Sequence, residues 1–332
     1  MNNQLNNITQ EELNHCNEII NKLDQYYSKR IVGQINLERS LLICLMANGH
    51  ILLESVPGLA KTTAAKVLTE AVAGKFSRIQ CTPDLLPSDI IGTQIFNYST
   101  NTFETRIGPI YANFVLLDEI NRSSAKTQSA TLEAMQEKQI TIDGKIYKMP
   151  EIFIVIATQN PIEQEGTYLL AEAQLDRFLL KEKVEYPTVK EEVEVLNRLE
   201  QKIFNDATAI LKLEDLRFLQ DLTEKVYIDD AIKKYIAQII LATRYPQNYI
   251  DKNLAEYINL GSSPRGTIAF MQCAKALALI NGRNYVIPED VKELRYEVLR
   301  HRISLNFSAM ADNISVEQII DAIIGAIPTP WN

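Results

Sequence analysis

The stretch Ser55-Val56-Pro57-Gly58-Leu59-Ala60-Lys61-Thr62 lies between an apolar run and a helical pattern. The apolar run, His50–Glu54, predicts a strand, and residues 63–73 predict a helix. A turn with a Pro-Gly pair can direct backbone N–H groups inward, and the unpaired N–H groups of a helix start attract phosphate. The lysine adds a positive charge, and the threonine hydroxyl can hold Mg²⁺. The stretch therefore predicts a nucleotide-binding turn, with an ordinary strand–helix turn as the alternative.

This turn departs from the simple P-loop pattern at two positions. The pattern G-x-x-x-x-G-K-[ST] has glycine where this chain has Ser55 and Ala60. If the backbone at residue 55 must adopt a positive φ, serine costs about 1 kcal/mol there. We expect that cost to affect the affinity for ATP or the rate more than the identity of the ligand.

A second apolar run ends in two carboxylates. Leu116-Leu117-Asp118-Glu119 places both acids at the tip of a buried strand in the same α/β unit as the turn. Asp118 is placed to hold Mg²⁺, and Glu119 is placed to orient and deprotonate an attacking water. A strand that merely ends in acids is common, but the two features together predict an ATP site.

Three further segments carry polar groups that can serve phosphate chemistry. Asn160 ends the strand after Asp118, where its amide could hold the water or the γ-phosphate. Arg177 precedes the last predicted strand, which we expect at the far side of the sheet from the P-loop, and it could reach the phosphate of a neighbouring subunit. Arg265 follows Ser263 and Pro264, which are typical of a helix start. Each residue alone is more often a structural hydrogen bonder, so their order along the chain is the informative part.

The order of strands and helices predicts a parallel sheet covered by helices. After a helix that Thr9 and Glu12 cap, ending near Tyr27, five buried strands are predicted. They are His50–Glu54, Phe76–Cys81, Phe114–Leu117, Ile152–Ala157 and Phe178–Val184. We expect these strands to form one α/β domain, residues 1–187.

From residue 188 to residue 332 we expect a smaller, all-helical domain. Its predicted helices are Val189–Leu199, Leu213–Val226, Ala231–Thr243, Pro264–Asn281, Pro288–His301 and Val316–Ile327. Two β-hairpins, at about 94–108 and 139–148, interrupt the α/β domain, the second around Asp143-Gly144. Such hairpins either contact another molecule or merely cover an edge of the sheet.

Composition excludes several classes of protein. The net charge is −8 and the pI is about 5.2, which disfavours nucleic acid as a partner. The four cysteines and three histidines are scattered, which argues against a metal cluster or a disulfide framework. The sequence has no apolar run of the roughly 20 residues that span a bilayer, and no signal-peptide pattern. We expect a cytoplasmic protein with no membrane span.

The chain resembles MoxR-type AAA+ ATPases of the helix-2-insert clade over nearly its whole length. The matching stretches are Ile31–Gln34, Val56–Thr62, Leu117–Arg122, Thr127-Gln128, Leu132–Glu137, Ile156–Pro161, Ala173–Phe178 and Ser263–Gly266. The resemblance implies a P-loop AAA+ core with a helical lid domain, and the two hairpins would be the helix-2 insert and the pre-sensor-1 hairpin. Ala60 is usual in this family, whereas Ser55 stands where its members commonly have glycine.

The resemblance also implies a set of nucleotide-binding residues. The adenine pocket and the Walker A turn would be formed by Val32, Gly33, Ser55, Val56, Pro57, Gly58, Leu59, Ala60, Lys61, Thr62 and Thr63. Thr62 and Asp118 would hold Mg²⁺, and Glu119 would be the catalytic base of Walker B. The cofactors would accordingly be ATP and Mg²⁺.

Three catalytic residues outside the Walker motifs follow from the same resemblance. Asn160 would be sensor 1, Arg177 the arginine finger acting in trans, and Arg265 sensor 2. A finger that acts in trans requires a homo-oligomer, and the family implies a ring, which we expect to be hexameric.

The family implies a chaperone-like ATPase that remodels or matures a protein client, often with a partner that carries a von Willebrand factor A domain. One alternative is the motor subunit of a metal chelatase-like complex. A nucleic-acid-dependent ATPase of the helicase type is a further alternative, which the negative charge disfavours. A nucleotide-binding scaffold without turnover is another, and Glu119 argues against it because a pure switch needs no base.

Overall fold

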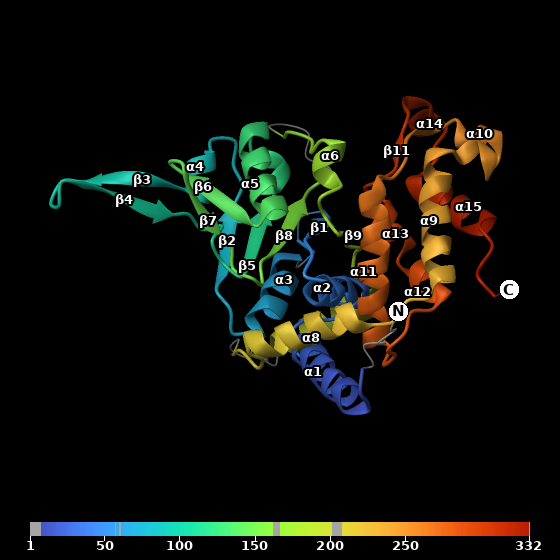
Figure 1. Cartoon of the computed structure of the whole chain (residues 1–332), viewed down its shortest axis with the longest axis horizontal. Coiled ribbons are helices and arrows are strands. Elements are labelled where there is room, and N and C mark those ends of the chain that lie inside the picture. Colours follow the sequence, from blue (N-terminus) through green and yellow to red (C-terminus); the bar gives the residue numbers. More distant parts are fainter. Residues whose placement is uncertain (1–7, 57, 60, 162–166, 201–207, 332) are drawn as a thin grey trace, which may run out of the picture.

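The computed structural model describes residues 8–56, 58–59, 61–161, 167–200 and 208–331, and for Lys61 the backbone alone. Five parallel strands form the central sheet in the order β2-β5-β8-β1-β9 (Figure 1). The strands are β1 (Ile51–Glu54), β2 (Phe76–Gln80), β5 (Phe114–Asp118), β8 (Ile154–Gln159) and β9 (Leu180–Lys183). The predicted parallel five-stranded sheet is confirmed, and each strand end lies within two residues of its predicted position.

The three central strands are buried on both faces because their apolar side chains alternate between two hydrophobic clusters. In β1, Ile51 and Leu53 join the cluster beneath α1, α2 and α3, whereas Leu52 joins the cluster beneath α5. The helices of this half of the chain are α1 (Gln10–Ser28), α2 (Ile35–Met46), α3 (Lys61–Glu70), α4 (Pro87–Ile91), η1 (Ile120–Arg122), α5 (Ala125–Glu137) and α6 (Glu172–Leu175). The predicted cap of the first helix is confirmed, since Thr9 and Glu12 exchange hydrogen bonds as a capping box.

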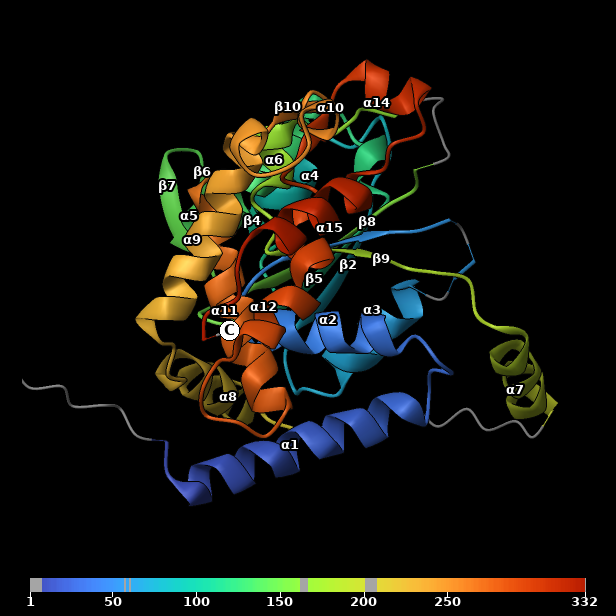
Figure 2. The same cartoon turned by 90° about the vertical axis from the view of Figure 1, so that its right-hand side faces the viewer.

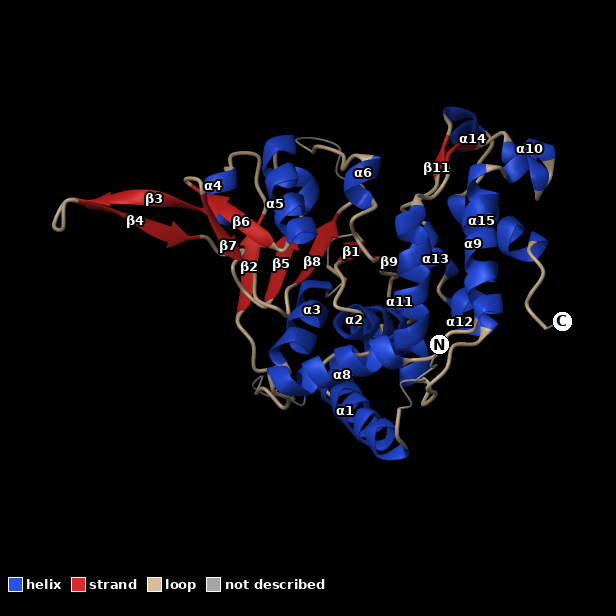
Figure 3. Ribbon diagram, viewed as in Figure 1, coloured by secondary structure: helices blue, strands red, loops and turns tan. Residues whose placement is uncertain are grey.

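Both predicted hairpins form. The first consists of β3 (Gly92–Asn97) and β4 (Thr102–Ile107), and it extends far beyond the body of the molecule (Figures 1 and 3). The second consists of β6 (Gln139–Ile142) and β7 (Lys145–Lys148), turned by Asp143 and Gly144, both of which have positive φ. The two hairpins touch near the base of the first, where the Tyr147 hydroxyl donates to Thr105 Oγ1 at 3.2 Å. The second hairpin packs against α5, while the first is largely free of the sheet.

The carboxyl-terminal part of the chain is mostly helical. Its elements are α7 (Val189–Glu200), α8 (Leu213–Lys225), α9 (Asp230–Arg244), η2 (Pro246–Asn248), α10 (Lys252–Ala255), β10 (Ile258–Leu260), α11 (Pro264–Ile280), α12 (Pro288–Glu293), α13 (Arg295–Leu299), β11 (Ser304–Leu305), α14 (Phe307–Ala311) and α15 (Val316–Ala326). Two features differ from the expected all-helical lid. An antiparallel ribbon pairs β10 with β11. The helix predicted over Pro288–His301 divides in two at Leu294, where the backbone leaves the helical region.

The two parts of the chain share one core. The cluster that covers one face of the sheet continues into α8, α9 and α11, so the division between residues 187 and 188 stays a prediction. Helix α7 stands apart from the other helices (Figure 2) and buries no side chain completely. Among the described residues, no helix has the length and apolar character needed to cross a membrane.

Candidate active site

The predicted Walker A turn joins the carboxyl end of β1 to the start of α3, as expected. Gly58 adopts a φ of +89°, a conformation that glycine accepts without steric cost. Ser55 is buried and is not among the residues with positive φ. Its backbone N–H donates to Gln159 O at 3.2 Å, and its hydroxyl donates to Val56 O at 3.1 Å. The condition under which serine would strain the turn is therefore not met. Pro57, Ala60 and the side chain of Lys61 lie outside the described residues.

The Asp118 carboxylate lies where the predicted Mg²⁺ ligands must meet. It accepts hydrogen bonds from Thr158 Oγ1 at 2.8 Å and from Thr62 Oγ1 at 3.3 Å. A carboxylate and a hydroxyl oxygen are ligands that suit Mg²⁺, so this pair fits the ion that the family implies. The structure thus brings Thr62 and Asp118 together across the gap between the P-loop and β5.

A cation from the edge strand also reaches Asp118. Arg78 of β2 donates from Nη2 to Asp118 Oδ2 at 2.6 Å, although the arginine side chain is 53% exposed. Sequence reasoning did not single out Arg78. No local signal marked it, because its contact with Asp118 depends on the pairing of β2 with β5, in which Gln80 lies opposite Asp118. Any divalent ion at Asp118 must therefore compete with this guanidinium.

Glu119 follows Asp118 in a left-handed conformation, with φ +57° and ψ +52°. That turn directs its side chain away from the strand, and its backbone N–H donates to Thr158 Oγ1 at 2.9 Å. Its carboxylate accepts from Gln80 Nε2 at 3.2 Å and pairs with Arg122 Nε at 3.3 Å. The carboxylate is thus held by side chains rather than by the backbone, so it can be released when another partner arrives.

Asn160 lies just beyond the carboxyl end of β8, beside the two acids along the same edge of the sheet. It is buried, and its backbone carbonyl accepts from Asn121 Nδ2 at 3.3 Å. Because β8 pairs with β5 and with β1, Asn160 is next to both the acids and the P-loop. This placement agrees with the position expected for sensor 1.

A cavity of about 450 Å³ lies beside the P-loop. Its walls are Val32, Gly58, Leu59 and Thr63 on one side and apolar side chains of α7 on the other, among them Leu196 and Leu199. Gly33, next to Val32, has a φ of +65°, and a Cβ added there would collide with the Glu191 side chain of α7. A narrow apolar slot beside a phosphate-binding turn is suited to a nucleobase.

Arg177 and Arg265 line a different cavity, of about 180 Å³, at the opposite end of β1. This cavity begins at Gly49 and His50, whereas the P-loop begins after Glu54. At roughly 3.3 Å per residue, a four-residue strand alone separates the two by about 13 Å. We call the residues Asp176, Arg177, Arg265 and Arg302 the arginine face.

The prediction that the strand after Arg177 lies at the far side of the sheet from the P-loop is wrong. Strand β9, which follows Arg177, pairs directly with β1. The separation instead runs along the strands, from their amino ends to their carboxyl ends. Arg265, expected from the family as sensor 2, lies beside Arg177 and not beside the P-loop: its Nη2 donates to Gln136 Oε1 at 3.2 Å, and its Nη1 lies 3.8 Å from Asp176 Oδ2.

The arginine face carries an excess of positive charge. Its cavity is lined by three arginines and one carboxylate, Asp176. Burial lowers the pKa of His50, which also lines it, to about 4, so this imidazole is neutral at pH 7. Arg177 Nε is buried without a hydrogen-bond partner among the described residues, and Arg265 is 44% exposed. A guanidinium with one unsatisfied nitrogen beside a half-exposed guanidinium is suited to an anion that arrives from outside the chain.

Comparisons with known proteins match both parts of the chain. Residues 50–180 match the ATPase family associated with various cellular activities (AAA), and residues 250–323 match the AAA lid domain. The chain is 45% identical over 300 residues to the chaperone MoxR1 of Mycobacterium tuberculosis, covering 90% of this chain and 79% of that protein. It is 44% identical over 314 residues to the uncharacterized protein YeaC of Bacillus subtilis, covering 94% and 95% of the two chains.

A solved structure shares the fold over almost the whole length. The crystal structure of a protein from Cytophaga hutchinsonii, described as a candidate ATPase, superposes with a TM-score of 0.90 at 44% identity and covers 96% of this chain and 97% of that one. The parallel sheet, the P-loop, the paired acids and the lid accord with these matches. The chain belongs to the MoxR-type AAA+ ATPases.

Proposed function

We propose that the chain hydrolyses ATP at the interfaces of a homo-hexameric ring and uses the reaction to remodel a protein client. One observation supports the first part: the residues that we assign to ATP hydrolysis lie in two groups at opposite ends of β1 in one chain. The acids and the P-loop are at the carboxyl end, and the arginine face is at the amino end. Head-to-tail packing in a ring would join the two halves from adjacent subunits.

At the carboxyl end, the residues divide the work of phosphoryl transfer. The P-loop from Ser55 to Thr63 would cradle the phosphates with backbone N–H groups and the α3 amino terminus. Thr62 and Asp118 would hold Mg²⁺, which neutralises charge on the phosphate oxygens when it is bound. Glu119 would leave Gln80 to orient the water and take its proton, and Asn160 would fix that water in line.

At the amino end, Arg177 would reach the γ-phosphate bound by the next subunit. There it would stabilise the charge that spreads over the phosphate oxygens in the transition state. Arg265 lies on the same face, so we assign it to the same neighbouring nucleotide. Neither arginine is near the P-loop of its own chain, which is why each subunit alone would be a poor ATPase.

A mixing experiment tests this proposal. Glu119→Gln and Arg177→Ala should each be nearly inactive alone, because each removes one half of every site. In an equal mixture with random assembly, about a quarter of the interfaces pair an intact Glu119 with an intact Arg177. ATPase activity near a quarter of the wild-type value is the expected result. If subunit exchange is demonstrated and activity stays at background, the two residues do not act across an interface.

The projecting hairpin supports the second part of the proposal, a protein client. Phe96 stacks edge-on against both Tyr98 and Phe103, each at 5.1 Å between ring centroids. Tyr98 is 89% exposed and Phe103 is 67% exposed, at the outer part of the β3–β4 hairpin. Exposed aromatic clusters of this kind are suited to apolar segments of another protein.

Replacement of Tyr98 and Phe103 by serine tests the role of the hairpin. We expect the double variant to lose capture of a reduced, carboxymethylated protein by the ATP-locked Glu119→Gln ring. The melting temperature of the variant serves as the control for folding. Unchanged capture would remove the hairpin from the client site and favour a motor that acts on a dedicated partner, such as a metal chelatase-like complex or a von Willebrand factor A domain.

A further inference from the structure

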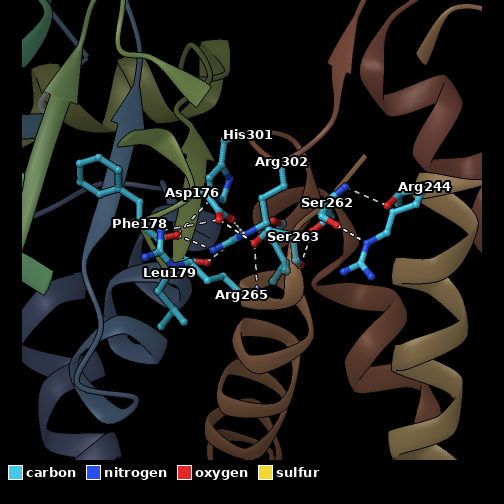
Figure 4. Close-up of polar contacts among 11 residues, drawn as sticks. Asp176, Phe178, Leu179, Arg244, Ser262, Ser263, Arg265, His301 and Arg302 are labelled. Atoms are coloured by element: carbon cyan, nitrogen blue, oxygen red, sulfur yellow. Dashed lines mark hydrogen bonds and ion pairs between the residues drawn. The ribbon is translucent and has the colours of Figure 1, made fainter. Parts of the chain in front are cut away.

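Asp176 connects the arginine face to the lid. Its Oδ2 accepts from the Ser263 hydroxyl at 2.7 Å, and its Oδ1 accepts from Arg302 Nε at 3.0 Å (Figure 4). Ser263 is the N-cap of α11, the helix that carries Arg265. One carboxylate thus joins the segment that contains Arg177 to two separate parts of the lid.

Arg302 completes the connection from within the protein. Its side chain is 2% exposed, and it donates to Phe178 O at 2.6 Å and to Leu179 O at 3.2 Å (Figure 4). The backbone on both sides of Arg177 is therefore attached to the lid, through Asp176 before it and Phe178 after it. His301 adds a contact from the same turn, since its Nε2 lies 3.0 Å from Phe178 O.

We propose that Asp176 is a positioning residue that makes Arg177 and Arg265 a single two-arginine unit fixed to the lid. This inference rests on the proposed function, because it assigns the unit to the nucleotide of the neighbouring subunit. The carboxylate does not contact phosphate in this scheme. It sets where the two guanidiniums stand, and it obliges them to move together whenever the lid moves.

Charge and burial explain why a carboxylate is needed at this position. Arg302 is buried, and a buried cation without a partner is strongly destabilising. Arg265 and Arg177 would also repel each other across a small cavity without a negative charge between them. Asp176 pairs with Arg302 and lies 3.8 Å from Arg265, and the half-exposed Arg265 side chain stays accessible to an external anion. Because the Asp176 side chain is short, Ser263, Arg265 and Arg302 can contact it only if they lie close to its backbone, which restricts the geometry of the unit.

The change Asp176→Asn tests the inference, because it keeps the shape and removes the charge. Loss of the carboxylate beside buried Arg302 should lower the free energy of unfolding, but Arg302 keeps its bonds to Phe178 O, Leu179 O and Val298 O, so we expect the variant to fold. A misplaced catalytic group costs on the order of 10²-fold in rate, and we expect a loss of about that size in kcat. The affinity for ATP of dissociated subunits should stay within about twofold of the wild-type value, since the P-loop lies at the other end of β1.

Complementation distinguishes a positioning role from a structural one. Asp176→Asn mixed with Glu119→Gln should recover about a quarter of wild-type activity, as for Arg177→Ala. Asp176→Asn mixed with Arg177→Ala should stay at background, because both lack the same half of the site. Asp176→Glu should restore part of the activity without any mixing, because it returns the charge.

Each other outcome overturns the inference in a recognisable way. Recovery with Arg177→Ala but not with Glu119→Gln would place Asp176 in its own P-loop site. Recovery with neither, while Glu119→Gln and Arg177→Ala complement each other, would reduce Asp176 to a folding role. If the mixture of Glu119→Gln and Arg177→Ala recovers no ATPase activity despite subunit exchange, the proposed function is contradicted, and the inference that rests on it is contradicted as well.

A second variant keeps the test decisive if Asp176→Asn does not fold. Ser263→Ala removes one partner of Asp176 and leaves the ion pair with Arg302 in place. We expect a smaller loss of kcat with the same complementation pattern. Full activity of Ser263→Ala in the ring would show that the attachment of α11 to the finger segment has no part in the reaction.

Discussion

The two ends of β1 differ in the groups they present and in what holds those groups. At the carboxyl end, Asp118 and Glu119 are acceptors, held by side chains from neighbouring strands such as Arg78 and Gln80. At the amino end, the arginines are donors, and they are fixed to the lid through Asp176. We therefore expect the first set to rearrange when a ligand arrives, and the second set to move together with the lid. Turnover would then depend on a local change in one subunit and on a lid movement in the next.

The largest effect that we expect from this difference between the two ends of β1 concerns Arg265. Arg265→Ala should lower kcat on the order of 10²-fold, because it removes one donor from a developing negative charge. The affinity of dissociated subunits for a fluorescent ATP analogue should not change, since Arg265 is remote from its own P-loop. Arg265→Lys is the matched control, which keeps the charge and loses the two-pronged geometry. Weaker nucleotide binding by dissociated Arg265→Ala would mean that Arg265 contacts the nucleotide bound to its own P-loop.

The contribution of His50 to the stability of the fold should be lost in acid. His50 accepts from Val155 N–H at 3.0 Å, and its Nε2 lies 3.3 Å from Met135 O, an arrangement that requires the neutral ring. Its pKa is lowered to about 4 by burial, so its contribution is present above pH 6.5 and is lost as pH falls toward 4. The loss is about 3 kcal/mol.

Urea unfolding of the wild type and of His50→Gln at pH 7.5 and pH 4.5 measures this contribution. The difference in the free energy of unfolding between the wild type and His50→Gln should decrease by about that amount on acidification. The comparison cancels Glu38 and Glu182, whose pKa values are raised to about 7 by burial and which act in the opposite direction. A difference that is the same at both pH values would mean that His50 is not protonated on unfolding.

The sequence predicted most of the sheet, and it predicted that Asp118 and Thr62 meet, because those signals are local. Asp143-Gly144 defines a two-residue turn, so β6 and β7 were predicted with their observed ends. Asp118, at the end of β5, meets Thr62 as expected. These patterns depend on residues that are close in the chain or on the shared edge of parallel strands.

What the sequence did not predict depends on contacts between distant segments. Arg78 meets Asp118 only through the pairing of β2 with β5, and Asp176 meets Ser263 only through the packing of the lid. The side of the molecule on which Arg265 lies follows from that same packing. The ribbon β10–β11 is too short, with strands of three and two residues, to carry a periodic signal.

We expect a smaller effect, on Mg²⁺ affinity, from a change at the carboxyl end of β1. Arg78→Gln removes the cation that competes for Asp118, so Mg²⁺ should bind more tightly. Because Arg78 is half exposed, its ion pair is worth no more than about 1 kcal/mol, which corresponds to roughly fivefold in affinity. Mg²⁺ titrations of a bound fluorescent ADP measure this directly, with Arg78→Lys as the matched control that keeps the charge. Weaker Mg²⁺ binding would instead give Arg78 a part in holding the nucleotide.

The smallest expected effect concerns the turn itself, where two positions that the P-loop pattern treats alike should behave differently. Ser55→Gly should leave ATP affinity within about twofold of the wild-type value, because Ser55 has no positive φ to relieve. Gly58→Ala should weaken ATP binding by about fivefold, since its φ of +89° costs an L-residue about 1 kcal/mol. A Cβ at residue 58 meets no atom of the described residues within 4 Å, so we assign that cost to the backbone conformation. Fluorescence binding of ATP by both variants decides the matter, and tighter binding by Ser55→Gly would show that the serine strains the turn after all.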